Sequence, residues 1–120
     1  MATAGTGLQI DRERREDTVL VHARGELDLQ TAAALCAPLD AAIRAPRSRI
    51  LLDLGDVTFC DSTGLRVLMG VVQEARAHRS RLAIVVPPDS GVARLIELTG
   101  TGEFLPLVAD REAGDRLLSR

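Results

Sequence analysis

The stretch that most constrains the fold is residues 50–72, where the hydrophobic pattern changes from that of a strand to that of a helix. Its first five residues are mostly apolar, as expected for a strand that is covered on both faces. From Leu65 onward, apolar residues recur at three- and four-residue steps, which is typical of an amphipathic helix. Between the two, Asp61 or Ser62 is a suitable N-cap, because its side-chain oxygen can accept a first-turn N–H. A hydroxyl group is therefore presented at the positive end of a helix, where a phosphate is also tolerated.

The preceding part of the chain predicts two strands and a helix. The expected order is an edge strand at 8–12, a mixed-charge turn at 12–17, a better strand at 18–24 and an exit from the sheet at 25–28. Thr31 can then cap an amphipathic helix that runs to about residue 44. Pro38 lies inside this helix, lacks a backbone donor and disfavours helical geometry in the residue before it. We therefore expect either a kink at Pro38 or a later start of the helix.

The rest of the chain predicts strands alternating with helices. The expected order is a central strand at 49–54, the helix after Asp61, a strand at 82–86, a helix at 92–98 capped from 87–90, an edge strand at 104–108 and a helix at 110–118. This order indicates an α/β fold, a small mixed β-sheet with parallel units layered with about four helices. We expect residues 1–7 to be a flexible start and residues 8–120 to form one domain.

Composition excludes several classes of function. The net charge of −2 offers no basic field for nucleic acid or anionic membranes, and two Phe without Trp or Tyr offer no platform for base stacking. No apolar run reaches membrane-spanning length and no signal segment is recognisable, so a cytoplasmic protein is expected. Cys36 and Cys60 lack redox or zinc spacing and are expected to be buried, reduced thiols. No metal and no cofactor are predicted.

Four hypotheses compete for the loop at residues 61–64. A serine nucleophile needs a base nearby, but His22 is the lone histidine of its strand and His78 lies about 24 Å further along the helix. The G-x-S-x-G elbow is also missing, so an enzyme is not expected. An aspartic-protease half site fails because one extra residue separates Asp61 from Gly64. A purely structural helix cap and a phosphoacceptor at a docking surface both remain open.

A phosphoacceptor would act through charge. A phosphate on Ser62 adds nearly two negative charges close to Asp61 and Asp28, so it can reject a partner while the fold survives. Helical geometry places Val67 and Val71 away from the stripe that begins at Leu65. They are either exposed beside Ser62, as the apolar part of a docking patch, or half covered by a wide sheet-facing stripe. The pattern does not decide between these alternatives.

Two motifs, GELDLQTA at residues 25–32 and LDLGDVTFCDSTGLRVL at residues 52–68, resemble the anti-sigma factor antagonists of the STAS domain family. The resemblance follows the order of elements over almost the whole chain. It implies that Ser62 is phosphorylated by a partner kinase, with Asp61, Gly64 and Leu65 matching the rest of the loop motif. Thr63 stands where serine or another small residue is usual, and so leaves a second hydroxyl. Asp28 is the candidate for contacting the kinase or for shaping its docking site.

The resemblance also implies a function by partner switching in bacterial transcription regulation, during stress response or development. The unphosphorylated antagonist binds an anti-sigma factor that is also a serine kinase with bound ATP, and thereby releases sigma factor. Phosphorylation at Ser62 abolishes binding, and a serine phosphatase restores the antagonist. The same family leaves an alternative, a non-switching scaffold subunit of a stress-signalling assembly or a cytoplasmic subunit of a lipid-transport ABC system.

Overall fold

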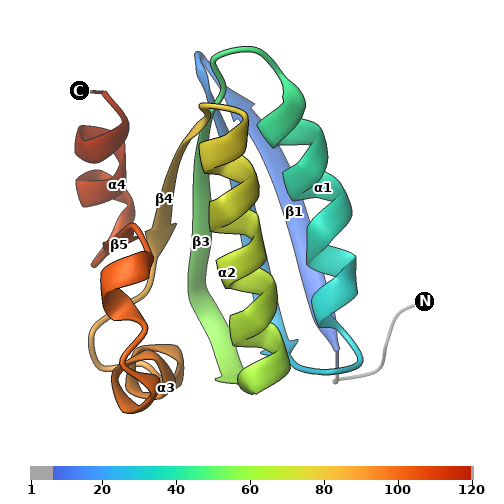
Figure 1. Ribbon diagram of the computed structural model, residues 1–120, viewed down its shortest axis with the longest axis vertical. Coiled ribbons are helices and arrows are strands. Elements are labelled where there is room, and N and C mark those ends of the chain that lie inside the picture. Colours follow the sequence, from blue (N-terminus) through green and yellow to red (C-terminus); the bar gives the residue numbers. More distant parts are fainter. Residues whose placement is uncertain (1–6, 120) are drawn as a thin grey trace.

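The computed structural model describes residues 7–119, in which five strands form one sheet of order β1-β2-β3-β4-β5 (Figure 1). The first two strands are antiparallel, and every later neighbouring pair is parallel. The strands are β1 (Leu8–Arg15), β2 (Thr18–Leu27), β3 (Arg49–Cys60), β4 (Arg81–Val85) and β5 (Leu107–Val108). The predicted mixed sheet with parallel units is confirmed.

Helices cover both faces of this sheet. They are α1 (Ala32–Arg44), α2 (Ser62–Ala77), α3 (Gly91–Thr99) and α4 (Arg111–Leu118), with a short 3-10 helix η1 (Gly102–Phe104) before β5. In Figure 1, α1 and α2 run side by side in front of the strands. Their apolar faces share one core with α3, whereas Leu118 of α4 belongs to a second cluster on the opposite face.

The central strand β3 shows why its apolar run is continuous. Side chains alternate across a strand, so Ile50 and Leu52 join the core under α1 and α2 while Leu51 joins the cluster under α4. All three are fully buried. The strand continues past its first polar residue because the buried Asp53 is satisfied: its carboxylate accepts from Arg111 Nε at 2.6 Å and from the backbone N–H of Gly55 at 2.7 Å.

Three predicted strand ends were wrong, and the first is that of β1, which runs to Arg15 instead of ending at residue 12. β2 does not leave the sheet at Gly25, and β3 does not stop at residue 54, because Gly25, Glu26 and Leu27 pair with Val57, Phe59 and Cys60. The register shifts twice along this pairing, at irregularities that accommodate the turn-forming residues which had suggested strand ends. The two strands therefore end together.

The first helix begins at Ala32 and runs through Pro38 without interruption, so a later start was wrong, and a kink stays a prediction. Thr31 occupies the N-cap position, but its side chain makes no cap bond. Its hydroxyl instead donates to the carbonyl oxygen of Glu26 at 2.6 Å.

The later part of the chain follows the prediction more closely. Ser90 and Asp110 cap α3 and α4 through their side chains, and Leu118 docks α4 on the sheet. The last strand does lie at an edge, but it is only two residues long because η1 takes up residues 102–104. The expected flexible start falls almost entirely outside the described residues.

Candidate functional site

The candidate site lies where β2 and β3 end side by side, at the lower end of the sheet in Figure 1. Leu27 pairs with Cys60 in the last step of this parallel ladder. The chain after β2 turns into α1, and the chain after β3 turns into α2. Parallel pairing thus brings the two sequence motifs together, although they are separated by about thirty residues.

Asp61 joins the two turns. Its Oδ1 accepts from the N–H of Gly64 at 2.9 Å, which caps α2, and its Oδ2 accepts from the N–H of Leu29 at 3.2 Å. Its own N–H donates to the carbonyl oxygen of Leu27 at 3.2 Å. Of the two candidate N-caps, Asp61 is the one used. One carboxylate therefore fixes both the start of α2 and the turn before α1.

Asp28 shapes the turn before α1. Its Oδ1 accepts from the backbone N–H groups of Gln30 and Thr31, at 3.0 and 3.2 Å, and lies 3.2 Å from the hydroxyl oxygen of Thr31, whose proton is donated to Glu26. The backbone N–H of Asp28 in turn donates to that hydroxyl oxygen at 2.9 Å. The acceptor capacity of Oδ1 is thus taken up within its own turn, and the expected role of Asp28 in a kinase-docking site stays a prediction.

Gly64 is the close-contact point between the motifs. A Cβ placed on it would lie 2.6 Å from the carbonyl oxygen of Leu27, 2.9 Å from Cγ of the same residue and 3.0 Å from Sγ of Cys60. Real Cβ atoms do not approach backbone oxygen that closely. Any side chain at this position would therefore push the start of α2 away from the end of β2.

The two hydroxyl groups of the loop differ in access. Ser62, the first residue of α2, is exposed, whereas Thr63 is half-buried.

The structure also decides between the alternatives for Val67 and Val71. Val71 is buried at 5% exposure, and Val67 is half-buried and packs against the core. Because α2 contacts α1 as well as the sheet, its buried stripe is wider than a sheet-facing stripe alone, so Val71 as a partner-contacting residue was wrong.

Sequence reasoning missed two exposed apolar residues at this end of the sheet. Leu29 is 75% exposed in the turn before α1, and Phe59 is 51% exposed near the end of β3. A signal for Phe59 was present, because its strand neighbour Cys60 faces the core and neighbouring side chains point to opposite faces. Leu29 carried no such signal, since a leucine in a short turn is more often buried.

Acidic side chains outnumber basic ones around Ser62, although the exposed Arg66 lies one turn further along α2. Residues 25–43 and 50–65 contain no Arg, Lys or His, whereas Glu26, Asp28, Asp56 and Asp61 lie on the strand ends and turns of the site. The N-terminus of α2 supplies the opposing partial positive charge. The site therefore combines an exposed hydroxyl, a helix N-terminus and an acidic rim.

The geometry gives no support to hydrolytic chemistry at Ser62. His22 Nε2 lies 2.7 Å from Asp56 Oδ2 in the strands, as a packed histidine rather than a base for the loop. His78 is the C-cap of α2, at the other end of the helix from Ser62. Burial and the negative charge of Asp61 raise the pKa of Cys60 to about 11, which keeps this thiol protonated and poorly nucleophilic. Among residues 7–119, no cluster of three or more metal-ligating side chains occurs.

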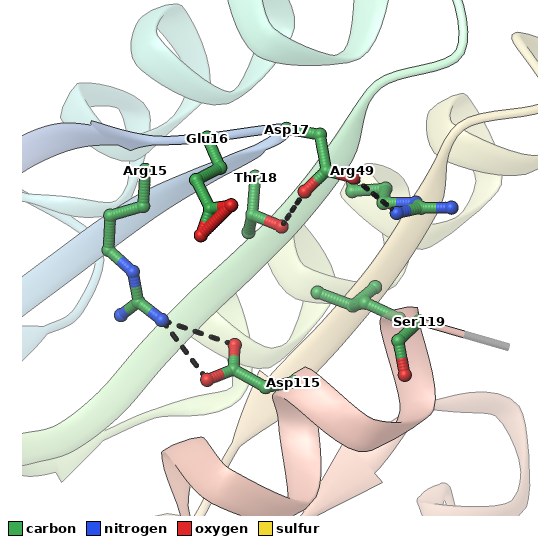
Figure 2. Close-up of a pocket in the computed structure, with 8 residues that line it drawn as sticks. Arg15, Glu16, Asp17, Thr18, Arg49, Asp115 and Ser119 are labelled. Atoms are coloured by element: carbon green, nitrogen blue, oxygen red, sulfur yellow. Dashed lines mark hydrogen bonds and ion pairs between the residues drawn. The ribbon is translucent and has the colours of Figure 1, made fainter.

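A separate polar pocket of about 270 Å³ lies at the opposite end of the sheet, between the β1–β2 turn and α4 (Figure 2). It is lined in part by Arg49, the first residue of β3, and so lies about 35 Å along the strand from the Ser62 loop. Its two arginines are engaged, Arg15 with Asp115 and Arg49 with Asp17. It therefore plays no part in the chemistry of the loop.

In the described residues, no helix has the length and apolarity that a membrane span requires.

Comparison with known proteins identifies the family. The family model described as "Mlab, STAS domain" matches residues 10–109. The anti-sigma F factor antagonist of Paenibacillus polymyxa is 32% identical over 103 residues, which cover 83% of this chain and 86% of that protein.

Solved structures show the same fold. A crystal structure of an anti-sigma factor antagonist from Mycobacterium paratuberculosis superimposes with a TM-score of 0.80 at 23% identity, over the whole of both chains. The Bacillus cell fate determinant SpoIIAA in its phosphorylated form superimposes with a TM-score of 0.63 at 24% identity, over 90% of this chain and 98% of that one. With its two motifs joined at one end of a five-stranded mixed sheet, the chain belongs to the STAS domain family of anti-sigma factor antagonists.

Proposed function

We propose that this chain is an anti-sigma factor antagonist that acts by partner switching, with Ser62 as its phosphoacceptor. The observation that carries the proposal is the contrast within the loop. Asp61, Gly64 and Asp28 are committed to hydrogen bonds or close packing, while the side chain of Ser62 is exposed on a rigid helix start. The protein acts as a binding partner and a substrate rather than as an enzyme.

In the proposed cycle, the unphosphorylated chain binds an anti-sigma factor that is also a serine kinase, and sigma factor is released. Ser62 Oγ then attacks the γ-phosphorus of ATP held by the kinase, the bond to the ADP oxygen breaks, and the hydroxyl proton passes to a base of the kinase. A serine phosphatase later hydrolyses the phosphoserine with water and releases inorganic phosphate. This chain contributes only the oriented hydroxyl and the surface around it.

The position of Ser62 supports a switch in which one phosphate changes binding without unfolding the chain. The phosphate would lie at the N-terminus of α2, where the backbone N–H groups and the helix dipole stabilise an anion. Next to it, however, are the carboxylate of Asp61 and, in the complex, the phosphates of the kinase-bound nucleotide. The resulting repulsion destabilises the complex with the kinase far more than it destabilises the folded chain.

The experiment that tests this function is peptide-mapped mass spectrometry after incubation of the chain with ATP and lysate of the cells that express it. We expect phosphate on Ser62 in the wild-type chain and none in Ser62→Ala. A Thr63→Ala variant, treated in the same way, should be phosphorylated like wild type, because Thr63 is half-buried. Phosphate on Thr63 alone would move the acceptor, and no phosphate under conditions that modify a control antagonist would favour the scaffold or transporter-subunit alternative.

Binding distinguishes the states of the switch. Ser62→Ala should bind the kinase constitutively, because it cannot be phosphorylated and so is not released. Ser62→Asp should bind the kinase weakly. Equal, wild-type binding by both variants would contradict partner switching at this residue.

A further inference from the structure

In the part of the chain that the structure describes, four large apolar side chains are exposed, in two matched pairs. Leu29 and Phe59, exposed by 75% and 51%, lie at the same end of the sheet as Ser62, whereas Leu98 and Phe104, exposed by 76% and 56%, lie on α3 and η1. Both phenylalanines of the chain are therefore on its surface, and no Trp or Tyr is present. Aromatic side chains, Phe among them, are enriched at protein interfaces relative to the rest of the surface.

Leu29, Phe59 and Ser62 all lie at one end of the sheet, so a partner that contacts this end can cover all three, although Phe59 points to the face opposite Cys60 and α2. Phe59 is three residues from Ser62, which limits their Cα separation to about 11 Å. The N–H of Leu29 is 3.2 Å from Oδ2 of Asp61, which places Leu29 within about 12 Å of Ser62. A stable interface buries about 800 Å² on each partner, a patch of about 16 Å radius.

Both side chains stand on backbone that is already fixed. Phe59 pairs with Glu26 in the parallel ladder, and the turn of Leu29 is held by Asp61 and by the internal bonds of Asp28. A partner that covers them gains apolar contact area without ordering a loop, which lowers the entropic cost of association.

The charge of the site indicates the chemistry of the partner surface. Glu26, Asp28, Asp56 and Asp61 lie on the strand ends and turns, and the segments at residues 25–43 and 50–65 carry no Arg, Lys or His. The exposed Arg66 lies one turn further along α2, so acidic side chains outnumber basic ones around Ser62. A complementary surface is therefore apolar at its centre, opposite Leu29 and Phe59, and carries Arg or Lys at its rim.

We infer that Leu29 and Phe59 are the apolar anchors by which a serine kinase docks before it phosphorylates Ser62, and that the kinase meets them with an apolar hollow rimmed by basic side chains. The inference rests on the proposed function, since it takes the occupant of this surface to be the enzyme that must reach Ser62. The inference identifies the side chains that supply affinity for the kinase, whereas the loop motif identifies only the phosphate acceptor.

The test compares matched substitutions in the phosphorylation assay. Initial rates of phosphate transfer to Ser62 from ATP, in lysate of the expressing cells, are measured against the concentration of added chain. Leu29→Ala and Phe59→Ala should each raise the apparent KM by about tenfold with little change in the maximal rate, as expected for loss of a remote contact. Leu98→Ala and Phe104→Ala remove the same residue types at nearly equal exposure and should match wild type.

The outcomes separate the inference from the function on which it rests. Wild-type kinetics in both Leu29→Ala and Phe59→Ala would overturn the docking surface and leave Ser62 as the acceptor. An equal or larger rise in KM in Leu98→Ala and Phe104→Ala would assign docking to α3 and η1 and would also overturn it. No phosphate on the wild-type chain would refute the function and the inference together. Thermal melting of each variant identifies a loss due to unfolding, and Leu29→Ala, in an exposed turn, should melt like wild type.

Discussion

Two glycines of α2 provide a sharp test of the way the site is packed. Gly64 faces Leu27 and Cys60 at distances that leave no room for a Cβ, whereas a Cβ on Gly70 would meet nothing within 4 Å. Both residues are helical, so alanine gains the same type of backbone stabilisation at each position. The substitutions Gly64→Ala and Gly70→Ala therefore differ chiefly in steric contact.

The expected magnitudes follow from these contacts. Alanine in place of glycine inside a helix raises the free energy of unfolding by about 1 kcal/mol, which is the full effect expected at Gly70. At Gly64 the added methyl group would lie 2.6 Å from a backbone oxygen. Overpacking of this kind costs about 1–3 kcal/mol, and we expect the upper value because backbone cannot rotate away. The net loss at Gly64 is then about 2 kcal/mol, and the two variants differ by about 3 kcal/mol.

Thermal or urea unfolding measures this difference. For a chain of 120 residues, 1 kcal/mol corresponds to about 4 °C in Tm. Gly64→Ala should melt about 8 °C below wild type, and Gly70→Ala about 4 °C above it. A Gly64→Ala variant as stable as wild type, or more stable, would refute the close approach of α2 to the end of β2. Equal losses in both variants would point to a general intolerance of α2 rather than to this contact.

Three further predictions concern other residues. Asp61→Ala should lower the free energy of unfolding by about 1 kcal/mol and Asp61→Asn by clearly less, because asparagine keeps an acceptor for the helix start; equal losses in urea unfolding would contradict the cap. Because the pKa of Cys60 is raised to about 11 in the folded chain, the thiol of the unfolded chain ionises first as pH rises. The stability that the protonated Cys60 contributes is therefore complete below about pH 9 and disappears towards pH 11. Tm measured against pH should fall more steeply over this range in wild type than in Cys60→Ala, and identical profiles would exclude this contribution. Arg111→Met should cost about 2 kcal/mol in unfolding free energy because it leaves the buried Asp53 carboxylate with one partner fewer, whereas Arg116→Met, which removes an exposed ion pair, should change it by less than about 0.5 kcal/mol.

The regular elements were largely predictable because their signals are local. The amphipathic period of α2, the caps at Asp61, Ser90 and Asp110, and the continuous apolar run of β3 are all set by residues within a few positions of one another. The same local signals placed an exposed hydroxyl at a helix N-terminus, and the loop motif named Ser62. These features involve residues that are close in sequence, and the periods of helix and strand fix how such residues lie relative to one another.

Only the tertiary structure decided which distant residues share the site. The pairing of β2 with β3 beyond Gly25 depends on shifts in strand register that the hydrophobic pattern of the sequence does not indicate. This pairing brings the backbone N–H of Leu29 within hydrogen-bond distance of Asp61. The burial of Val71 depends likewise on α1, which approaches α2 from the side. Local sequence determined the hydroxyl and the helix that presents it. The surface around that hydroxyl arises from contacts between segments about thirty residues apart, whose geometry is set by packing and not by spacing in the chain.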